Sequence, residues 1–265
     1  QTMGFNGIGP TRTENDPWDL FLSPVGLKEY LLEIDGHPVT KGKDIHEVLS
    51  EYKVGDEITL TYLNLEEQET PISVKLFRFP DSDRFKYFYF PYLIGLVYLL
   101  IGIWMARMRL QESTGRSFII FSTSLAIGAG GLFDVYTFHH FTILWTFAIA
   151  MAGASLLDLG FSFPQESLLV RRQPYYHRAP YLIALFLFLF ALPDIYNLQE
   201  PSNYVAKWQY IYGFPGILIF AFISILFYRS YTEKSAIAKQ QIVMTRWGIL
   251  LSFTPIGVWM FISFI

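Results

Sequence analysis

Residues 33–62 read EIDGHPVTKGKDIHEVLSEYKVGDEITLTY, a stretch typical of a small folded module in water. Asp35 and Gly36 have the sequence of a tight two-residue turn that follows an apolar strand. Between residues 45 and 52 the apolar side chains recur at helical spacing, which predicts an amphipathic helix. Residues 57–63 and 72–77 alternate apolar and polar side chains, which predicts a hairpin. The stretch and its continuation therefore predict a small α+β domain.

The chain changes character after this domain. Of its 265 residues 52% are hydrophobic and only 16% are charged, whereas a soluble domain carries about 25% charged residues. A helix that spans a membrane needs about 20 mainly apolar residues. Six runs meet this need, at 87–106, 117–136, 142–163, 179–196, 210–228 and 247–265. We expect a membrane all-α helical bundle of six spans over 86–265, preceded by an α+β domain over 1–85; buried helices of a large soluble core are the alternative.

The composition also limits the chemistry of the chain. It has no cysteine, which excludes disulfides, thiolate metal sites and cysteine nucleophiles. A net charge of −3 gives no argument for a nucleic-acid partner. We find no nucleotide-binding loop, no zinc-protease motif and no serine-hydrolase elbow, and we expect no cofactor and no catalytic site. The first ten residues have no signal-peptide pattern and no initial Met, so we expect a piece of a longer protein.

Basic residues are distributed unevenly among the connections between the apolar runs. The connections after the first, third and fifth runs carry Arg107, Arg109, Arg116, Arg171, Arg172, Arg178, Arg229, Lys234, Lys239 and Arg246. The alternate connections hold almost no Lys or Arg. Because short cytoplasmic loops are enriched in Lys and Arg, we expect the basic loops to be cytoplasmic and residues 1–85 to be extracytoplasmic.

Three carboxylates lie in or near the apolar runs, where charge is costly and usually functional. Asp158 is the deepest, and we interpret it as a candidate polar switch or interhelical contact; a carboxylate satisfied by neighbouring helices is the alternative. Asp134 and Asp194 lie near the outer boundary and are candidates for interfacial residues. His139 and His140 could bind a metal or sense pH. Adjacent side chains point apart, however, so we interpret both as interfacial candidates and expect no metal site.

Small residues and prolines give a second, weaker signal within the runs. The sequence AIAMAGASLLDLG at 148–160 has small residues at close spacing, which predicts a face packed inside the bundle. Pro215, between two glycines, and Pro255 could break their helices as in transporters, or could be kinks that a bundle tolerates. A transporter or channel component is therefore a second hypothesis for the function.

The order of elements in residues 26–76 resembles the C-terminal half of a bacterial PDZ domain. The matching positions are Gly26–Leu27, Ile34–Gly36, Val39, Gly55–Asp56, Ile58 and Leu60, although the spacing in GLKEYLLEI is shorter than in that family. PDZ domains bind peptides by adding a strand beside a groove helix. The resemblance implies a groove lined by His46, Leu49 and Ser50; a degenerate scaffold without a groove is the alternative.

The layout of the whole chain resembles the input region of bacterial ComP-type sensor histidine kinases and related receptors with phosphatase or cyclase outputs. The stretches LDLGFSFPQES at 157–167 and KQQIVMTRWGILLSFTPI at 239–256 are similar to their loop motifs. The resemblance implies a multi-pass protein of the bacterial inner membrane with further spans before residue 1 and after residue 265. It also implies a cytoplasmic output domain, contact with membrane lipid, an extracellular peptide or small-molecule ligand, and a homodimer.

Overall fold

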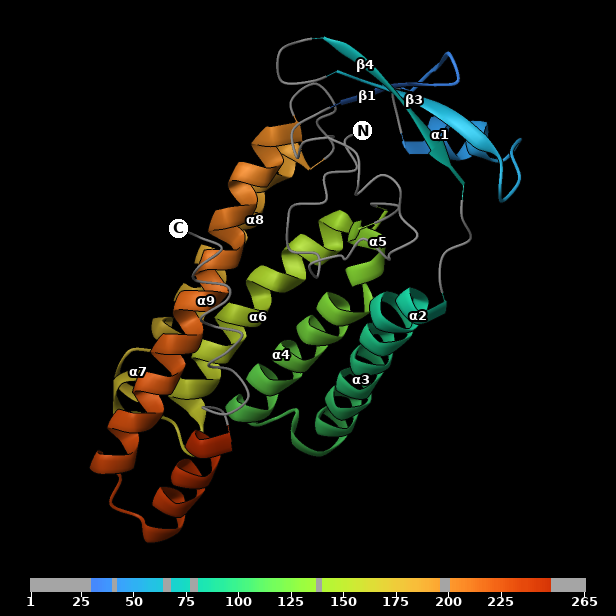
Figure 1. Cartoon of the computed structure of the whole chain (residues 1–265). Helices are drawn as coiled ribbons and strands as arrows, with labels where there is room; N and C mark the ends of the chain where they lie inside the picture. The colour runs from blue at the N-terminus through green and yellow to red at the C-terminus, as the bar shows by residue number, and fades with distance from the viewer. Residues whose placement is uncertain are drawn as a thin grey trace.

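The computed structural model describes residues 30–39, 42–63, 68–76, 81–136, 140–195 and 201–248. Within these ranges a four-stranded antiparallel sheet with one helix precedes a bundle of long helices (Figure 1). The structure is therefore mostly helical with a small sheet in its N-terminal part, as the sequence predicts at this coarser level.

The sheet part contains β1 (Tyr30–Ile34), β2 (His37–Pro38), α1 (Gly42–Leu49), β3 (Glu57–Leu63) and β4 (Glu69–Lys75), with the strand order β2-β1-β3-β4. Asp35 and Gly36 join β1 to β2 with φ angles of 47° and 79°. Positive φ at both positions is the requirement of a type I′ hairpin turn, which favours an Asp-Gly pair. The predicted strand, turn, helix and hairpin are thus present, although these elements do not identify a PDZ domain.

The alternating side chains of the strands form a separate small core. Leu31, Ile34, Val39, Ile45, Ile58, Leu60, Tyr62 and Val74 are all buried there. On β3 every second residue from Ile58 to Tyr62 is buried, whereas those between them are exposed or partly exposed. This period of two is what a strand with one covered face requires. The helix α1 contributes Ile45 to the same core.

The bundle contains α2 (Asp81–Arg84), a π-helical turn η2 (Phe85–Tyr89), α3 (Phe90–Arg109), α4 (Ser113–Gly130), α5 (Leu132–Tyr136), α6 (Thr142–Ser162), α7 (Leu168–Arg172), α8 (Tyr175–Ala191), the 3₁₀ turn η3 (Leu192–Asp194) and α9 (Pro201–Thr232). Residues 236–248 are also helical. The helix α6 is central, because it packs against α4, α8 and α9, while α3 packs against α4. Figure 1 shows α4 between α3 and α6.

Four of the described helices are long and apolar enough to cross a membrane: Phe90–Arg109, Thr142–Ser162, Tyr175–Asp194 and Ala206–Thr232. The prediction of six spans is therefore not confirmed. The predicted run 117–136 divides into the 18-residue α4 and the short α5. The apolar character of α4 is weakened by serines that point inward, and Ser117, Ser122 and Ser124 are buried. The predicted run 247–265 lies almost wholly outside the described residues.

The two ends of the bundle differ in composition. Figure 1 places the sheet beyond one end of the bundle, which we call the sheet end; the beginnings of α6 and α9 lie there. The opposite end, which we call the arginine end, contains the connection from α3 to α4, the helix α7 and the end of α9 (Figure 1). The arginine end carries seven arginines, which lie in α7 or within a few residues of the ends of α3, α4, α8 and α9. They are Arg107, Arg109, Arg116, Arg171, Arg172, Arg178 and Arg229. The predicted basic connections thus gather at one end, away from the sheet.

The small residues of α6 allow a close approach to α9. A Cβ atom added to Gly153 would lie 2.7 Å from the Cα atom of Pro215, so the two backbones are in contact there. Ala148, Ala152 and Ala154 on α6 are also buried. The expected packing role of this face is confirmed. The helix α9 continues through Pro215 from Pro201 to Thr232, so Pro215 does not break it.

Candidate functional site

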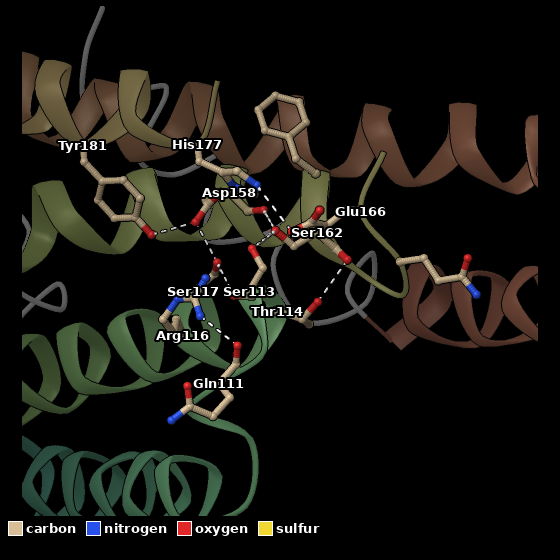
Figure 2. A network of polar contacts seen from close by, with 12 residues as sticks. Gln111, Ser113, Thr114, Arg116, Ser117, Asp158, Ser162, Glu166, His177 and Tyr181 are labelled. Carbon is tan, nitrogen blue, oxygen red and sulfur yellow. Dashed lines mark hydrogen bonds and ion pairs between the residues drawn. The ribbon is translucent and has the colours of Figure 1, made fainter. Parts of the chain in front are cut away.

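A carboxylate inside the bundle accepts hydrogen bonds from two other helices. Asp158 on α6 is only 6% exposed. The Ser117 hydroxyl on α4 donates to its Oδ2 atom at 2.6 Å, and the Tyr181 hydroxyl on α8 donates to the same atom at 3.1 Å. His177 Nδ1 on α8 makes a short hydrogen bond with Oδ1 (Figure 2). We call these four residues the Asp158 site, and it connects α4, α6 and α8.

The chain path explains why these side chains meet. Asp158 lies four residues before the end of α6, and His177 lies two residues after the start of α8, the next long helix of the described chain. The two helices pack against each other, so both positions are about equally far from the connection and lie at the same level. His177 and Tyr181 are four residues apart and therefore share one face of α8. Ser117 is in the first turns of α4, at the same end of the bundle.

Further hydroxyl groups form a second layer around the site (Figure 2). The Ser162 hydroxyl donates to the main-chain carbonyl of Asp158 at 2.9 Å, and the Thr114 hydroxyl donates to the carbonyl of Ser162 at 3.0 Å. The Ser117 hydroxyl has two acceptors within reach, because the carbonyl of Ser113 lies 3.0 Å from its oxygen. A hydroxyl has a single proton to donate. Ser117 can therefore bind Asp158 or close a hydrogen bond within α4.

His177 joins the buried carboxylate to the protein surface. Its Nε2 atom lies 3.9 Å from Oε1 of Glu166, whose side chain is 44% exposed, while the Asp158 side chain is 8% exposed. A buried carboxylate without a cation or hydrogen-bond donors is strongly disfavoured in an apolar environment. His177, Ser117 and Tyr181 supply these partners to Asp158 from two other helices.

A guanidinium from α9 closes the end of α6 beside this site. Arg229 is buried and donates to the carbonyls of Gly160 at 3.2 Å, Phe161 at 3.3 Å and Gln165 at 2.5 Å, and also to that of Phe163. The last carbonyls of a helix have no partner within it and carry partial negative charge. Arg229 satisfies these carbonyls and so attaches α9 to the end of α6.

The sheet end has a separate buried ion pair. The carboxylate of Asp194, in η3, pairs with the ammonium of Lys207 on α9. The same ammonium donates to the carbonyl of Phe190 at 3.1 Å and lies 4.6 Å from the centre of the Phe190 ring. The structure thus places the predicted interfacial residue Asp194 in a contact between the end of α8 and α9.

Asp134, the other predicted interfacial acid, lies in α5 and contacts the residues just before α6. Its carboxylate accepts the N–H of Phe141 at 2.7 Å and the N–H of His140 at 3.2 Å. The His140 ring nitrogen Nδ1 is 3.8 Å from the same carboxylate. Asp134 therefore holds the two residues that precede α6 through their N–H groups, and His139 lies outside the described residues.

The residues expected to line a PDZ-type groove have other contacts in the structure. Leu49 is partly buried and packs against the core of the sheet part. The Ser50 hydroxyl donates to the carbonyl of Glu47 at 2.7 Å and so closes the end of α1. The side chain of His46 lies outside the described part of the structure. The contacts of Leu49 and Ser50 are those of structural residues.

The sequence predicts Asp158 as a buried polar residue but does not predict its partners. His177 was not among the candidates. The equal distance of Asp158 and His177 from the connection between α6 and α8 would have paired them. Ser117 and Tyr181 carried no such signal, because Ser and Tyr are common in membrane helices and near their ends. Arg229 was seen only as a loop charge.

The Asp158 site consists of a carboxylate, an imidazole and two hydroxyl groups that are joined by hydrogen bonds. Within the described ranges no cluster of three or more His, Asp or Glu side chains could hold a metal ion.

No protein-family model, no curated protein and no solved structure matches this chain. The geometry of the site and the layout of the chain are therefore the basis for a functional hypothesis.

Proposed function

We propose that this chain is the ligand-sensing input region of a bacterial transmembrane signalling receptor. In this proposal a peptide or small molecule binds on the sheet side, and the bundle passes a helix rearrangement to a cytoplasmic output domain, a histidine kinase by resemblance. A phosphatase or cyclase output would use the bundle in the same way. The arginine end would face the cytoplasm, because Lys and Arg are enriched in cytoplasmic loops.

The observation that supports the proposal is the choice of partners at the Asp158 site. In one arrangement Ser117 and His177 both bind Asp158, at 2.6 Å for the serine hydroxyl, which holds α4 and α8 against α6. In the second arrangement that we propose, the Ser117 hydroxyl donates only to the Ser113 carbonyl, which lies 3.0 Å from its oxygen, and α4 is released from the carboxylate. Two arrangements of one packed contact are what a membrane switch requires.

A ligand can select between these arrangements only by binding one more tightly than the other. Equal affinity for both arrangements would leave their populations unchanged, and a shift from 1:99 to 99:1 needs about a 10⁴-fold difference in affinity. The sheet and the Asp158 site lie at opposite ends, so the long helices would transmit this difference. The continuous α9, attached by Arg229 to the end of α6, is suited to this role.

A distance measurement at the arginine end tests the proposal. Because the chain has no cysteine, spin labels can be attached to Gln111→Cys and Gln173→Cys without removing native thiols. Both residues are exposed, and they precede α4 and α8. We expect Asp158→Asn to shift the distribution of distances between the labels in lipid nanodiscs, because the asparagine amide cannot form the charged pair with His177. Pulsed electron paramagnetic resonance would record the shift.

The exposed Asp81, whose side chain is 90% accessible, provides the matched control. Asp81→Asn should leave the distance distribution unchanged. An unchanged distribution in Asp158→Asn would contradict the proposed switch. Proton or solute flux through proteoliposomes that depends on Asp158 would instead favour a transporter.

A further inference from the structure

An apolar crevice lies between the arginine-end halves of α6 and α8 and the middle of α9. Its volume is about 140 Å³. Its lining includes Leu157 and Phe161 of α6, Ala179, Pro180 and Ile183 of α8, and Phe214 of α9. Apart from the hydroxyl of Tyr176, which also lines the crevice, these side chains carry no charged or hydrogen-bonding group. The crevice is therefore a place for an apolar molecule.

The crevice opens on a surface that is suited to lipid. Of the candidate span in α8 only 17% is buried, and Ile183 at the crevice is 51% exposed. Apolar cavities of about 150 Å³ stay dry and accept small apolar molecules. In a bilayer the molecules that surround α8 are phospholipids, and their apolar parts are acyl chains. A segment of one acyl chain fits both the volume and the lining.

Two arginines lie in the sequence shortly before the part of α8 that lines the crevice. Arg171 and Arg172 end α7, and only two residues separate them from the start of α8. Both are exposed, and within the described ranges no acidic side chain forms an ion pair with either. Arginine binds phosphate oxygens through paired N–H groups, and basic pockets between membrane helices bind anionic lipid headgroups. This charge selects an anionic lipid over a zwitterionic one.

We propose that this crevice is a binding site for an anionic phospholipid, with an acyl chain against α6, α8 and α9 and the phosphate on Arg171 and Arg172. The site adjoins the Asp158 site, because Leu157 and Tyr176 line the crevice and directly adjoin Asp158 and His177 in sequence. A bound chain would fix the spacing of α6 and α8 where those two residues meet. This consequence rests on the proposed switch, whereas the binding itself does not.

Photo-labelling of the full chain tests the binding without any signalling readout. The probe is phosphatidylglycerol with a diazirine in its acyl chain, in phosphatidylcholine nanodiscs, with labelled peptides identified by mass spectrometry. We expect labelling of the α6 and α8 segments that line the crevice. Ala179→Leu places extra volume in the crevice and should reduce this labelling about tenfold, the equivalent of about 1.4 kcal/mol. Ala206→Leu, the same change at an exposed position on α9, should have no effect.

The charge requirement is tested in the same assay. Replacing both Arg171 and Arg172 by Gln should reduce labelling about thirtyfold, the equivalent of about 2 kcal/mol, because two basic residues near the anionic headgroup are lost. Arg178→Gln is the matched control, because the helical period places Arg178 on the face of α8 opposite Ala179 and Pro180. Ile183→Trp, at the exposed mouth, is a second blocking variant should Ala179→Leu not fold.

Two outcomes would overturn the proposal. Equal labelling of Ala179→Leu, Ile183→Trp and the unmodified chain would show that the probe only contacts the outer surface. Equal labelling by a phosphatidylcholine probe would show that the arginines do not select the headgroup. If labelling behaves as expected while Asp158→Asn leaves the spin-label distances unchanged, the lipid site stands and the switch fails.

Discussion

Two buried carboxylates lie near opposite ends of the bundle, and each pairs with a basic side chain. At the sheet end Asp194 pairs with Lys207, which also contacts the Phe190 carbonyl and ring. At the arginine end Asp158 pairs with His177 and accepts two hydroxyl groups. The side chains are similarly buried, with exposed fractions of 11% for Asp194 and 8% for Asp158.

The difference between the two pairs is the chemistry of the partner. At the sheet end one ammonium, that of Lys207, pairs with Asp194. At the arginine end Asp158 has an imidazole partner and also accepts hydrogen bonds from the hydroxyls of Ser117 and Tyr181. Loss of the imidazole would therefore leave Asp158 with two hydrogen-bond donors.

The largest expected effect comes from removing each carboxylate in turn. Asp194→Ala should lower the free energy of unfolding by about 3 kcal/mol, because it leaves the partly buried Lys207 cation without its carboxylate partner. Asp158→Ala should lower it by about 2 kcal/mol, because the loss is mainly that of the hydrogen bonds from Ser117, His177 and Tyr181. Unfolding by SDS in mixed micelles, followed by tryptophan fluorescence, would measure both.

A second substitution at the sheet end serves as the control. Adding Lys207→Met to Asp194→Ala should recover most of the loss, since replacing a buried ion pair by apolar side chains is often nearly neutral. If Asp158→Ala lowered the free energy of unfolding more than Asp194→Ala does, the comparison would be reversed. The histidine pair would then be the contact that contributes more to stability.

A smaller effect is expected from the guanidinium that closes α6. Arg229→Lys should lower the free energy of unfolding by about 1.5 kcal/mol, because one ammonium cannot donate to carbonyls as widely spaced as those of Gly160 and Gln165. The same micelle assay would measure it, with the exposed Arg107→Lys as a matched control that should stay within about 0.5 kcal/mol of the unmodified chain. No change in Arg229→Lys would mean that α9 is not attached to α6 through this side chain.

The fold was predictable wherever one local pattern decides an element. The alternation in residues 57–63, the Asp-Gly pair at 35–36 and the small residues at 148–154 correctly predicted a strand, a turn and a packed helix face. The α4 region was predicted less well, because the single apolar run expected at 117–136 divides into α4, which ends at Gly130, and the short α5. A count of apolar residues does not locate such a break, and it does not register the hydrogen bonds of the buried Ser117 and Ser122.

The sequence predicted the central residue of the site, Asp158, but did not predict the residues around it. An acid deep in an apolar run is conspicuous, so Asp158 stood out from the sequence alone. Its partners come from residues 41 and 19 positions away on two other helices. The pairing depends on the register between helices, which side-chain packing sets after folding. The same reason explains why the sequence predicted Arg229 only as a basic residue of a loop, although its guanidinium donates to carbonyls at the end of α6.

The smallest expected effect concerns Asp35, a carboxylate in the turn of the sheet part, outside the bundle. The Thr59 N–H, which donates to Asp35 at 2.6 Å, is the main cause that lowers the pKa of this carboxyl below its ordinary value, and the Tyr52 hydroxyl adds to it. A lowered pKa in the folded state means that the contribution to stability is complete above the unfolded value of about 3.9 and is lost as the pH falls through the folded value. Solvent screening limits it to about 0.5 kcal/mol.

Hydrogen exchange of the Thr59 amide in the full chain would detect this contribution. Between pH 5 and pH 3 the protection of that amide should fall in the unmodified chain, and Asp35→Asn should remove this pH dependence. Glu51→Gln, at an exposed position near Tyr52, should leave the dependence in place. If the protection were independent of pH in the unmodified chain, the carboxylate would not hold β3 to the turn. Only the carboxylates buried in the bundle would then contribute to stability through their partners, because water cannot replace a lost partner there.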